Sequence, residues 1–67
     1  MNTNHVKILR NHLDREDKTI LQWAMENGLP YRSTVMYLGG FNKGRHGVAR
    51  RVRMAVEREA MRLEGVV

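Results

Sequence analysis

Apolar residues recur along the first part of this chain at intervals of three and four, which is the period of a helix that buries one face. Val6, Leu9 and Leu13 follow this spacing, which predicts a helix over about residues 4–13. The wholly charged stretch 14–18 predicts a solvated connection. Alternating runs of β-branched residues, which are typical of strands, do not occur in the sequence. The pattern therefore predicts an all-α fold.

A capping signal and a glycine predict two short helices in the middle of the chain. Thr19 and the glutamine three residues later have the spacing of a capping box, in which each side chain binds a backbone amide of the other. A helix over about 20–27 follows, and Gly28 occupies the position where a left-handed residue ends a helix. Pro30 is favoured as a first helical residue, so a further helix is predicted over about 30–38. The residues of this region expected in the core are Trp23, Leu29, Val35 and Leu38.

A loop and a long helix complete the predicted fold. The stretch GGFNKGRHG is glycine-rich, which disfavours a helix, and predicts a basic loop with Phe41 as its apolar anchor. Good helix formers then predict one long helix over 48–64, in which Arg53 and Glu57 are spaced for an ion pair. The face of this helix predicted to turn inward carries Val48, Val52, Ala55, Val56, Glu59 and Leu63.

Length sets the expected architecture: one domain over 1–67, forming a compact bundle of four helices, with a fifth as an alternative. A chain of 67 residues buries only about 60% of the surface that it exposes when unfolded, so an enclosed substrate cavity is not expected. Small domains are commonly stabilised by disulfides, metals or a partner subunit. Because there is no cysteine, disulfides and thiolate metal sites are excluded. That leaves a marginal monomer or an oligomer, of which we favour a homodimer, with residues 56–67 as its contact.

Charge narrows the class of partner. Lysine and arginine number 12 against 7 acidic residues, which gives a net charge of +5 and a pI near 10.5. A domain with a pI above about 9 has the electrostatic footprint of a nucleic-acid-binding protein, although membrane surfaces and acidic proteins also attract basic domains. The sequence contains neither an apolar run of about 20 residues for a membrane span nor the apolar core of a signal peptide. The absence of cysteine permits a cytoplasmic setting, which is where we expect the protein.

Polar residues at the front of the predicted 30–38 helix indicate how such a protein binds. Two short helices joined by a glycine-bearing turn form a helix-turn-helix, whose second helix presents its N-terminal side chains to base edges in the DNA major groove. Arg32 is expected to bind guanine through two hydrogen bonds, and Ser33 to contact a base or a phosphate. Tyr31 is expected to contact the DNA or to staple the start of the helix. Thr34 belongs to the same polar front, and Tyr37 is expected at the groove edge.

The basic loop predicts contacts with the DNA backbone. Lys43, Arg45 and His46 stand among glycines that let the main chain approach a charged strand. Arg50 extends this basic surface into the last helix, although the arginines of that helix could equally form a solvated face. Phosphate contacts of this kind fix the register of a protein on DNA without reading its sequence.

At this point the sequence resembles a known family. Ala24 to Gly28 has the pattern A-x-x-x-G, followed by Leu29 and a polar stretch into Val35. This arrangement resembles the lambda-repressor and Cro-like helix-turn-helix family, and the basic loop with its following helix is similar to small phage and prophage regulators of that group. The resemblance covers residues 19 to about 56. It implies a compact helical bundle, a homodimer on a palindromic double-stranded DNA operator, and control of transcription.

The sequence departs from the pattern of that family at three points. The fifth helix of the family is missing or is merged into the predicted 48–64 helix. Family members usually place the buried aliphatic residue six positions after the turn glycine, whereas Val35 is seven positions after Gly28. In addition, Pro30 replaces the polar residue that customarily caps the second helix.

Other functions have less support in the sequence. The carboxylates of 14–17 lie among basic residues, no nucleophile is paired with a base, and His5 and His12 lack a third metal ligand. We therefore expect neither an enzyme nor a cofactor. Three alternatives to a regulator stay open: a helical hairpin in a protein-binding bundle, a small basic phage protein that inhibits an acidic host protein, and an excisionase-like protein that bends DNA.

Overall fold

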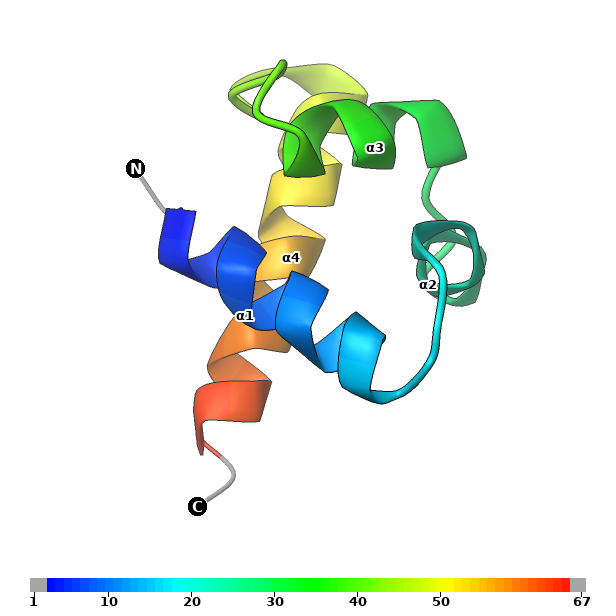
Figure 1. Cartoon of the computed structure of the whole chain (residues 1–67). Coiled ribbons are helices and arrows are strands. Elements are labelled where there is room, and N and C mark those ends of the chain that lie inside the picture. Colours follow the sequence, from blue (N-terminus) through cyan, green and yellow to red (C-terminus); the bar gives the residue numbers. More distant parts are fainter. Residues whose placement is uncertain (1–2, 66–67) are drawn as a thin grey trace.

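The computed structural model describes residues 3–65, and over this range the chain forms four helices and no strand, which confirms the predicted all-α fold. In chain order the helices are α1 (Thr3–Arg15), α2 (Ile20–Glu26), α3 (Tyr31–Leu38) and α4 (Gly47–Gly65). Figure 1 shows the long α4 crossed by α1, with α3 lying beside the N-terminal end of α4. α2 packs against α3 and connects it to α1.

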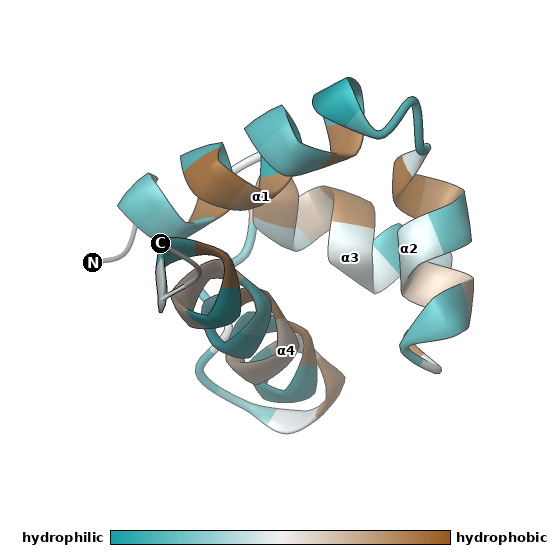
Figure 2. Cartoon of the chain, turned by 90° about the horizontal axis from the view of Figure 1, so that it is seen from below, coloured by the Kyte–Doolittle hydropathy of each residue, from teal (hydrophilic) through white to brown (hydrophobic). Residues whose placement is uncertain are grey.

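One hydrophobic core joins the four helices. Leu9 and Leu13 of α1 and Val52 and Val56 of α4 are each 3% exposed or less. In Figure 2 the apolar stretches of the helices are turned toward neighbouring helices, and hydrophilic stretches lie outside. The expected core residues Trp23, Leu29 and Leu38 are indeed buried. The region from α2 to α3 supplies Trp23, Ala24, Leu29, Tyr37 and Leu38 to the core.

α1, α2 and α3 all end in a motif in which a left-handed residue turns the chain out of the helix. At the end of α2, the amide of Leu29 donates to the carbonyl of Ala24 across 2.8 Å. The left-handed residue is Gly28 after α2 and Gly40 after α3, with φ of +65° and +85°. After α1 this position is taken by Asp17, with φ of +54°.

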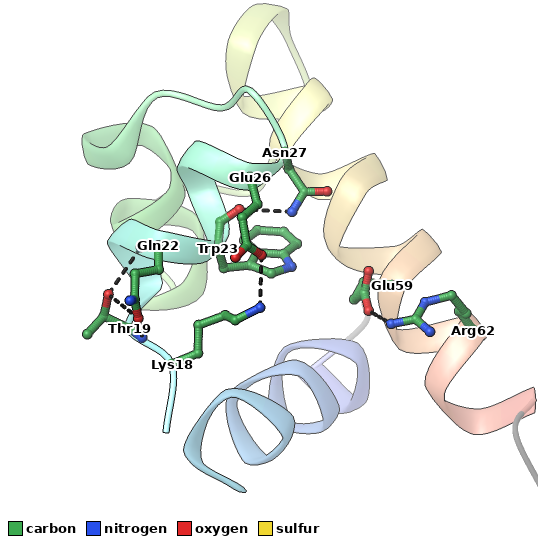
Figure 3. A network of polar contacts seen from close by, with 8 residues as sticks. All are labelled: Lys18, Thr19, Gln22, Trp23, Glu26, Asn27, Glu59 and Arg62. Carbon is green, nitrogen blue, oxygen red and sulfur yellow. Dashed lines mark hydrogen bonds and ion pairs between the residues drawn. The ribbon is translucent and has the colours of Figure 1, made fainter. Parts of the chain in front are cut away.

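The start of α2 confirms its predicted cap, and two other helix ends differ from prediction. The amide of Thr19 donates to Oε1 of Gln22 (2.8 Å), and the amide of Gln22 donates to Oγ1 of Thr19 (3.1 Å; Figure 3). α1 extends to Arg15, two residues beyond the prediction, because charged residues can form a solvated last turn without an apolar partner. Pro30 is the cap of α3 and not its first residue, since its ψ of 132° is extended.

α4 is one residue longer at each end than predicted, and its buried face differs. Val52, Val56 and Ala60 are fully buried, whereas Val48, in the first turn of α4, is 40% exposed. Ala60, in place of the predicted Glu59, continues the buried face by its spacing of four from Val56. The predicted ion pair between Arg53 and Glu57 is present at 4.0 Å.

Polar contacts shown in Figure 3 hold the corner before the turn into α3. Lys18 Nζ, in the connection, pairs with Glu26 Oε1 at the end of α2 across 2.9 Å. Asn27 Nδ2 donates to the carbonyl of Trp23 across 2.8 Å. A further pair joins Glu59 and Arg62 on α4. The first two contacts lie at the C-terminal end of α2, where Gly28 turns the chain toward α3.

Candidate nucleic-acid interface

α2 and α3 form a helix-turn-helix. Residues 27–30 join them, and Leu29 in this turn is buried. In Figure 1, α2 is seen nearly along its axis while α3 lies across the view, so the two helices cross steeply and do not run side by side. A steep crossing through a short turn containing glycine is the geometry of this motif. α3 occupies the place of its second helix.

The inner face of α3 contains Thr34, which corrects the prediction that this residue faces a ligand. Thr34 is 0% exposed, and its hydroxyl donates to the carbonyl of Pro30 across 2.8 Å. That bond satisfies the hydroxyl, so a polar residue can occupy the core at little cost. Thr34 lies six positions after Gly28, the spacing at which the helix-turn-helix pattern expects its buried residue. The more apolar Val35 lies one position further and is only partly buried.

Tyr37 is also a core residue, which corrects its predicted place at the edge of a DNA groove. Its side chain is 8% exposed. Burial raises the pKa of the Tyr37 phenol, the nearby Glu57 carboxylate raises it further, and Arg53 opposes them. The phenol is therefore neutral near pH 7, and in this conformation its buried ring supports the surrounding backbone and is not available to a ligand.

The outer face of α3 presents Arg32 and Met36. They are four residues apart, so they lie on the same side of the helix, and both are exposed, Met36 by 39%. Ser33 is partly exposed beside them, and Tyr31 at the helix start is 51% exposed. No pattern in the sequence marked Met36 as a contact residue. Its spacing from Arg32, together with the burial of Thr34, is the signal that could have identified it.

Two arginines from other helices bind main-chain carbonyls of the helix-turn-helix. Arg10 Nη1 on α1 donates to the carbonyl of Leu38 at the end of α3 across 3.2 Å. Arg51 Nη2 on α4 lies 3.5 Å from the carbonyl of Gly28, a long hydrogen bond. Cations are favourable near helix C-termini, where carbonyls lack partners. These two side chains therefore act in positioning α2 and α3.

The loop between α3 and α4 is anchored by Gly44 and not by Phe41, which corrects another prediction. Phe41 is 80% exposed. Gly44 is buried with a φ of +68°, and a Cβ on it would lie 2.6 Å from Cβ of Arg53. The amide of Gly44 also donates to Oδ1 of Asn42 across 2.8 Å. Backbone packing at Gly44 thus holds the loop on α4. The loop also exposes the side chains of Lys43, Arg45 and His46.

Positive charge is concentrated on this end of the molecule. The stretch 27–56, named here the basic segment, has no aspartate or glutamate, and the charges of the remaining residues nearly cancel. α3, the loop and the start of α4 lie together at the top of Figure 1, and Arg50 at the start of α4 is exposed as predicted. The absence of acidic residues over this stretch is readable in the sequence. The charged residues of the basic segment are Arg32, Lys43, Arg45, Arg50, Arg51 and Arg53.

Comparison with protein-family models, curated proteins and solved structures found no match to this chain. The assignment of a function therefore rests on the residues and geometry of the surface formed by α3, the loop and the start of α4.

The predicted homodimer contact over 56–67 is corrected in part. Val56 is fully buried in the core of its own protomer, so it cannot contact a second copy. Val66 and Val67 lie outside the described residues. Exposed apolar side chains on the described part of α4 are those of Val48, Met54 and Met61.

The remaining surface offers little chemistry. Within residues 3–65, no group of three histidine or acidic side chains is placed to hold a metal ion, and no helix is both long and apolar enough to cross a membrane. A shallow, open depression lies between α1 and the start of α2, lined by Arg10, Asn11, Leu13, Asp14, Lys18, Thr19 and Ile20.

Proposed function

We propose that this protein is a sequence-specific double-stranded DNA-binding regulator of transcription, of the lambda-repressor and Cro-like helix-turn-helix kind. The observation that carries the proposal is the coincidence of two features. The outer face of α3 lies within the basic segment, whose residues bear the net charge of the chain. A polyanion meets its strongest attraction there, and the second helix of a helix-turn-helix is the element that enters the major groove.

In this complex, Arg32 and the loop have different tasks. Arg32 projects from the first turn of α3, where a guanidinium can donate two hydrogen bonds to O6 and N7 of guanine, and Ser33 binds a base or phosphate beside it. Lys43, Arg45 and the nearby His46 and Arg50 lie against phosphates, which fixes the register of α3 in the groove. Tyr31, half exposed at the start of α3, binds the adjoining strand.

The proposal includes how the protein works in the cell. It acts in the cytoplasm of a bacterial host as a homodimer on a palindromic operator, with half-sites about 34–36 Å apart. It acts by binding and not by catalysis, and it needs no cofactor.

The test begins with duplex DNA of random sequence. Fluorescence anisotropy at low salt is expected to give micromolar or tighter association, and selection from a random pool is expected to return a palindromic consensus. No association with duplex at micromolar protein would contradict the proposal and favour the rival function, inhibition of an acidic host protein.

Arg32→Ala then tests how α3 reads the sequence. We expect it to weaken binding to the selected site by about fivefold to 160-fold for each bound protomer, because a bidentate arginine contributes about 1–3 kcal/mol of discrimination. Binding to random duplex should fall much less. The matched control is Arg15→Ala, which removes an exposed arginine on α1 outside the basic segment. Equal losses on selected and random DNA would make Arg32 a phosphate contact.

A further inference from the structure

Among the apolar side chains exposed within the basic segment, two lie at the C-terminal end of α3. Met36 is 39% exposed on the outer face of α3, and Phe41 is 80% exposed just beyond its end. The amide of Phe41 donates to the carbonyl of Met36 across 2.9 Å, so both residues are held at the same end of the helix. Met36 and Phe41 are named here the apolar pair.

A structural role in ending α3 does not account for this exposure. The ending motif often brings together side chains at the positions of Met36 and Phe41. Here, however, the Phe41 ring lies by Gly39, since a Cβ on Gly39 would come within 3.1 Å of two ring carbons, and four fifths of Phe41 remains open to solvent. The core is complete without either residue. The apolar pair is thus free to contact a partner.

The surrounding charge identifies the partner. Arg32 lies one turn before Met36 on the same face, Lys43 and Arg45 follow Phe41, and the segment that contains them has no acidic residue. Charge complementarity therefore favours a polyanion, and a second copy of this surface would be repelled. In the major groove of duplex DNA, the apolar group presented by the base edges is the C5-methyl of thymine.

We infer that the apolar pair reads thymine methyl groups, with Met36 making the main contact and Phe41 extending it. This inference rests on the proposed function and deepens it. Arg32 and Met36 lie on one face and one turn apart, so the half-site combines a guanine, bound by Arg32, with a thymine further along the groove, bound by Met36.

The experiment removes only the methyl group. In the duplex selected from a random pool, each thymine is replaced in turn by deoxyuridine, and affinities are measured by anisotropy. We expect the wild-type protein to lose about fourfold at one or two positions, the amount that corresponds to burying one methyl group. Met36→Ala should bind the parent site more weakly than the wild type does. Replacing thymine by deoxyuridine at the same positions should lower the affinity of Met36→Ala by less than about 1.5-fold.

Three variants keep the test specific. Met36→Leu retains an apolar side chain and should retain the response to deoxyuridine, and Phe41→Ala should reduce that response in part. The matched control is Met25→Ala, which makes the same change at a methionine that is 71% exposed on α2, outside the basic segment. It should leave the fourfold loss unchanged. Circular dichroism checks that each variant keeps its helices.

Two outcomes would overturn the inference while leaving the proposed function intact. The first is a wild-type protein that prefers its selected site to random duplex but is indifferent to deoxyuridine at every position. The second is a shift from dimer to monomer in Met36→Ala, measured by sedimentation, with no response to deoxyuridine, which would make the apolar pair a contact between copies. A protein that binds no duplex at all would overturn both the inference and the proposed function.

Discussion

The candidate interface depends on residue 44 being a glycine, which has no side chain. Gly44 combines a left-handed φ of +68° with backbone packed against Arg53, Tyr37 and Ala49. An L-residue in that conformation costs about 1–2 kcal/mol, and crowding a packed site costs about 1–3 kcal/mol more. Lys43 and Arg45 flank it, so a displaced Gly44 would move the two loop cations that we assign to phosphates.

We predict that Gly44→Ala lowers the free energy of unfolding by about 2–5 kcal/mol, measured by urea denaturation. The control is Gly47→Ala, because Gly47 has a similar φ of +58° but nothing within 4 Å of a Cβ. It should lose only about 1–2 kcal/mol, the cost of the left-handed conformation. Equal losses in the two variants would mean that the loop is not packed on α4 at Gly44.

At the scale of single residues, the apolar character of a side chain did not always predict whether it is buried. Trp23, Leu29 and Leu38 are buried as expected, but Thr34 is more buried than Val35, and Phe41 is largely exposed. The position of the Pro30 cap sets the first residue of α3. A shift of that first residue by one position would place Val35 instead of Thr34 on the inner face. The pattern of apolar and polar residues did not indicate that the Thr34 hydroxyl donates a hydrogen bond to the carbonyl of Pro30, the residue that caps α3.

At the scale of helices, the sequence predicts most clearly where the helices begin and end. The capping box at Thr19 and the left-handed Gly28 were both predictable, because each depends on residues close together in the chain. The end of α1 was not, because Asp17 takes a conformation usually left to glycine. The charged residues before it are compatible with either a helix or a loop, because they can form a solvated last turn without an apolar partner.

We predict that Asp17→Gly raises the free energy of unfolding by about 0.5–1 kcal/mol. Glycine removes the left-handed strain but adds entropy to the unfolded chain, so the net gain is smaller than the strain itself. Removing a carboxylate near a helix C-terminus contributes as well, and Asp17→Asn isolates that part because it removes the charge and keeps the Cβ. Thermal unfolding should rank glycine above asparagine and asparagine above aspartate. A loss of stability in Asp17→Gly would contradict the assigned role of this residue.

At the scale of the whole molecule, the charges are distributed unevenly, which the net charge alone does not show. The basic segment holds the excess, whereas Asp14, Glu16 and Asp17 lie where α1 ends and Glu26 ends α2. A polyanion therefore experiences attraction at one end of the protein and little at the α1–α2 corner. The net charge was available from composition alone. Its placement needed the fold, because α3 and the start of α4 are joined by a loop whose path the sequence does not specify.

This arrangement predicts that the salt dependence of DNA binding is determined by where the cations lie and not only by the net charge. Replacing Lys43 and Arg45 by glutamine should weaken binding to all duplexes. It should also lower the slope of log K against log salt by about one for each residue in each bound protomer, since each lost phosphate contact releases one counterion fewer. The matched variant replaces Lys7 and Arg15, two exposed cations of α1, and lowers the net charge equally. Its slope should stay near that of the wild type. Equal slopes in the two variants would mean that DNA senses only total charge, and the loop would then have no place in the interface.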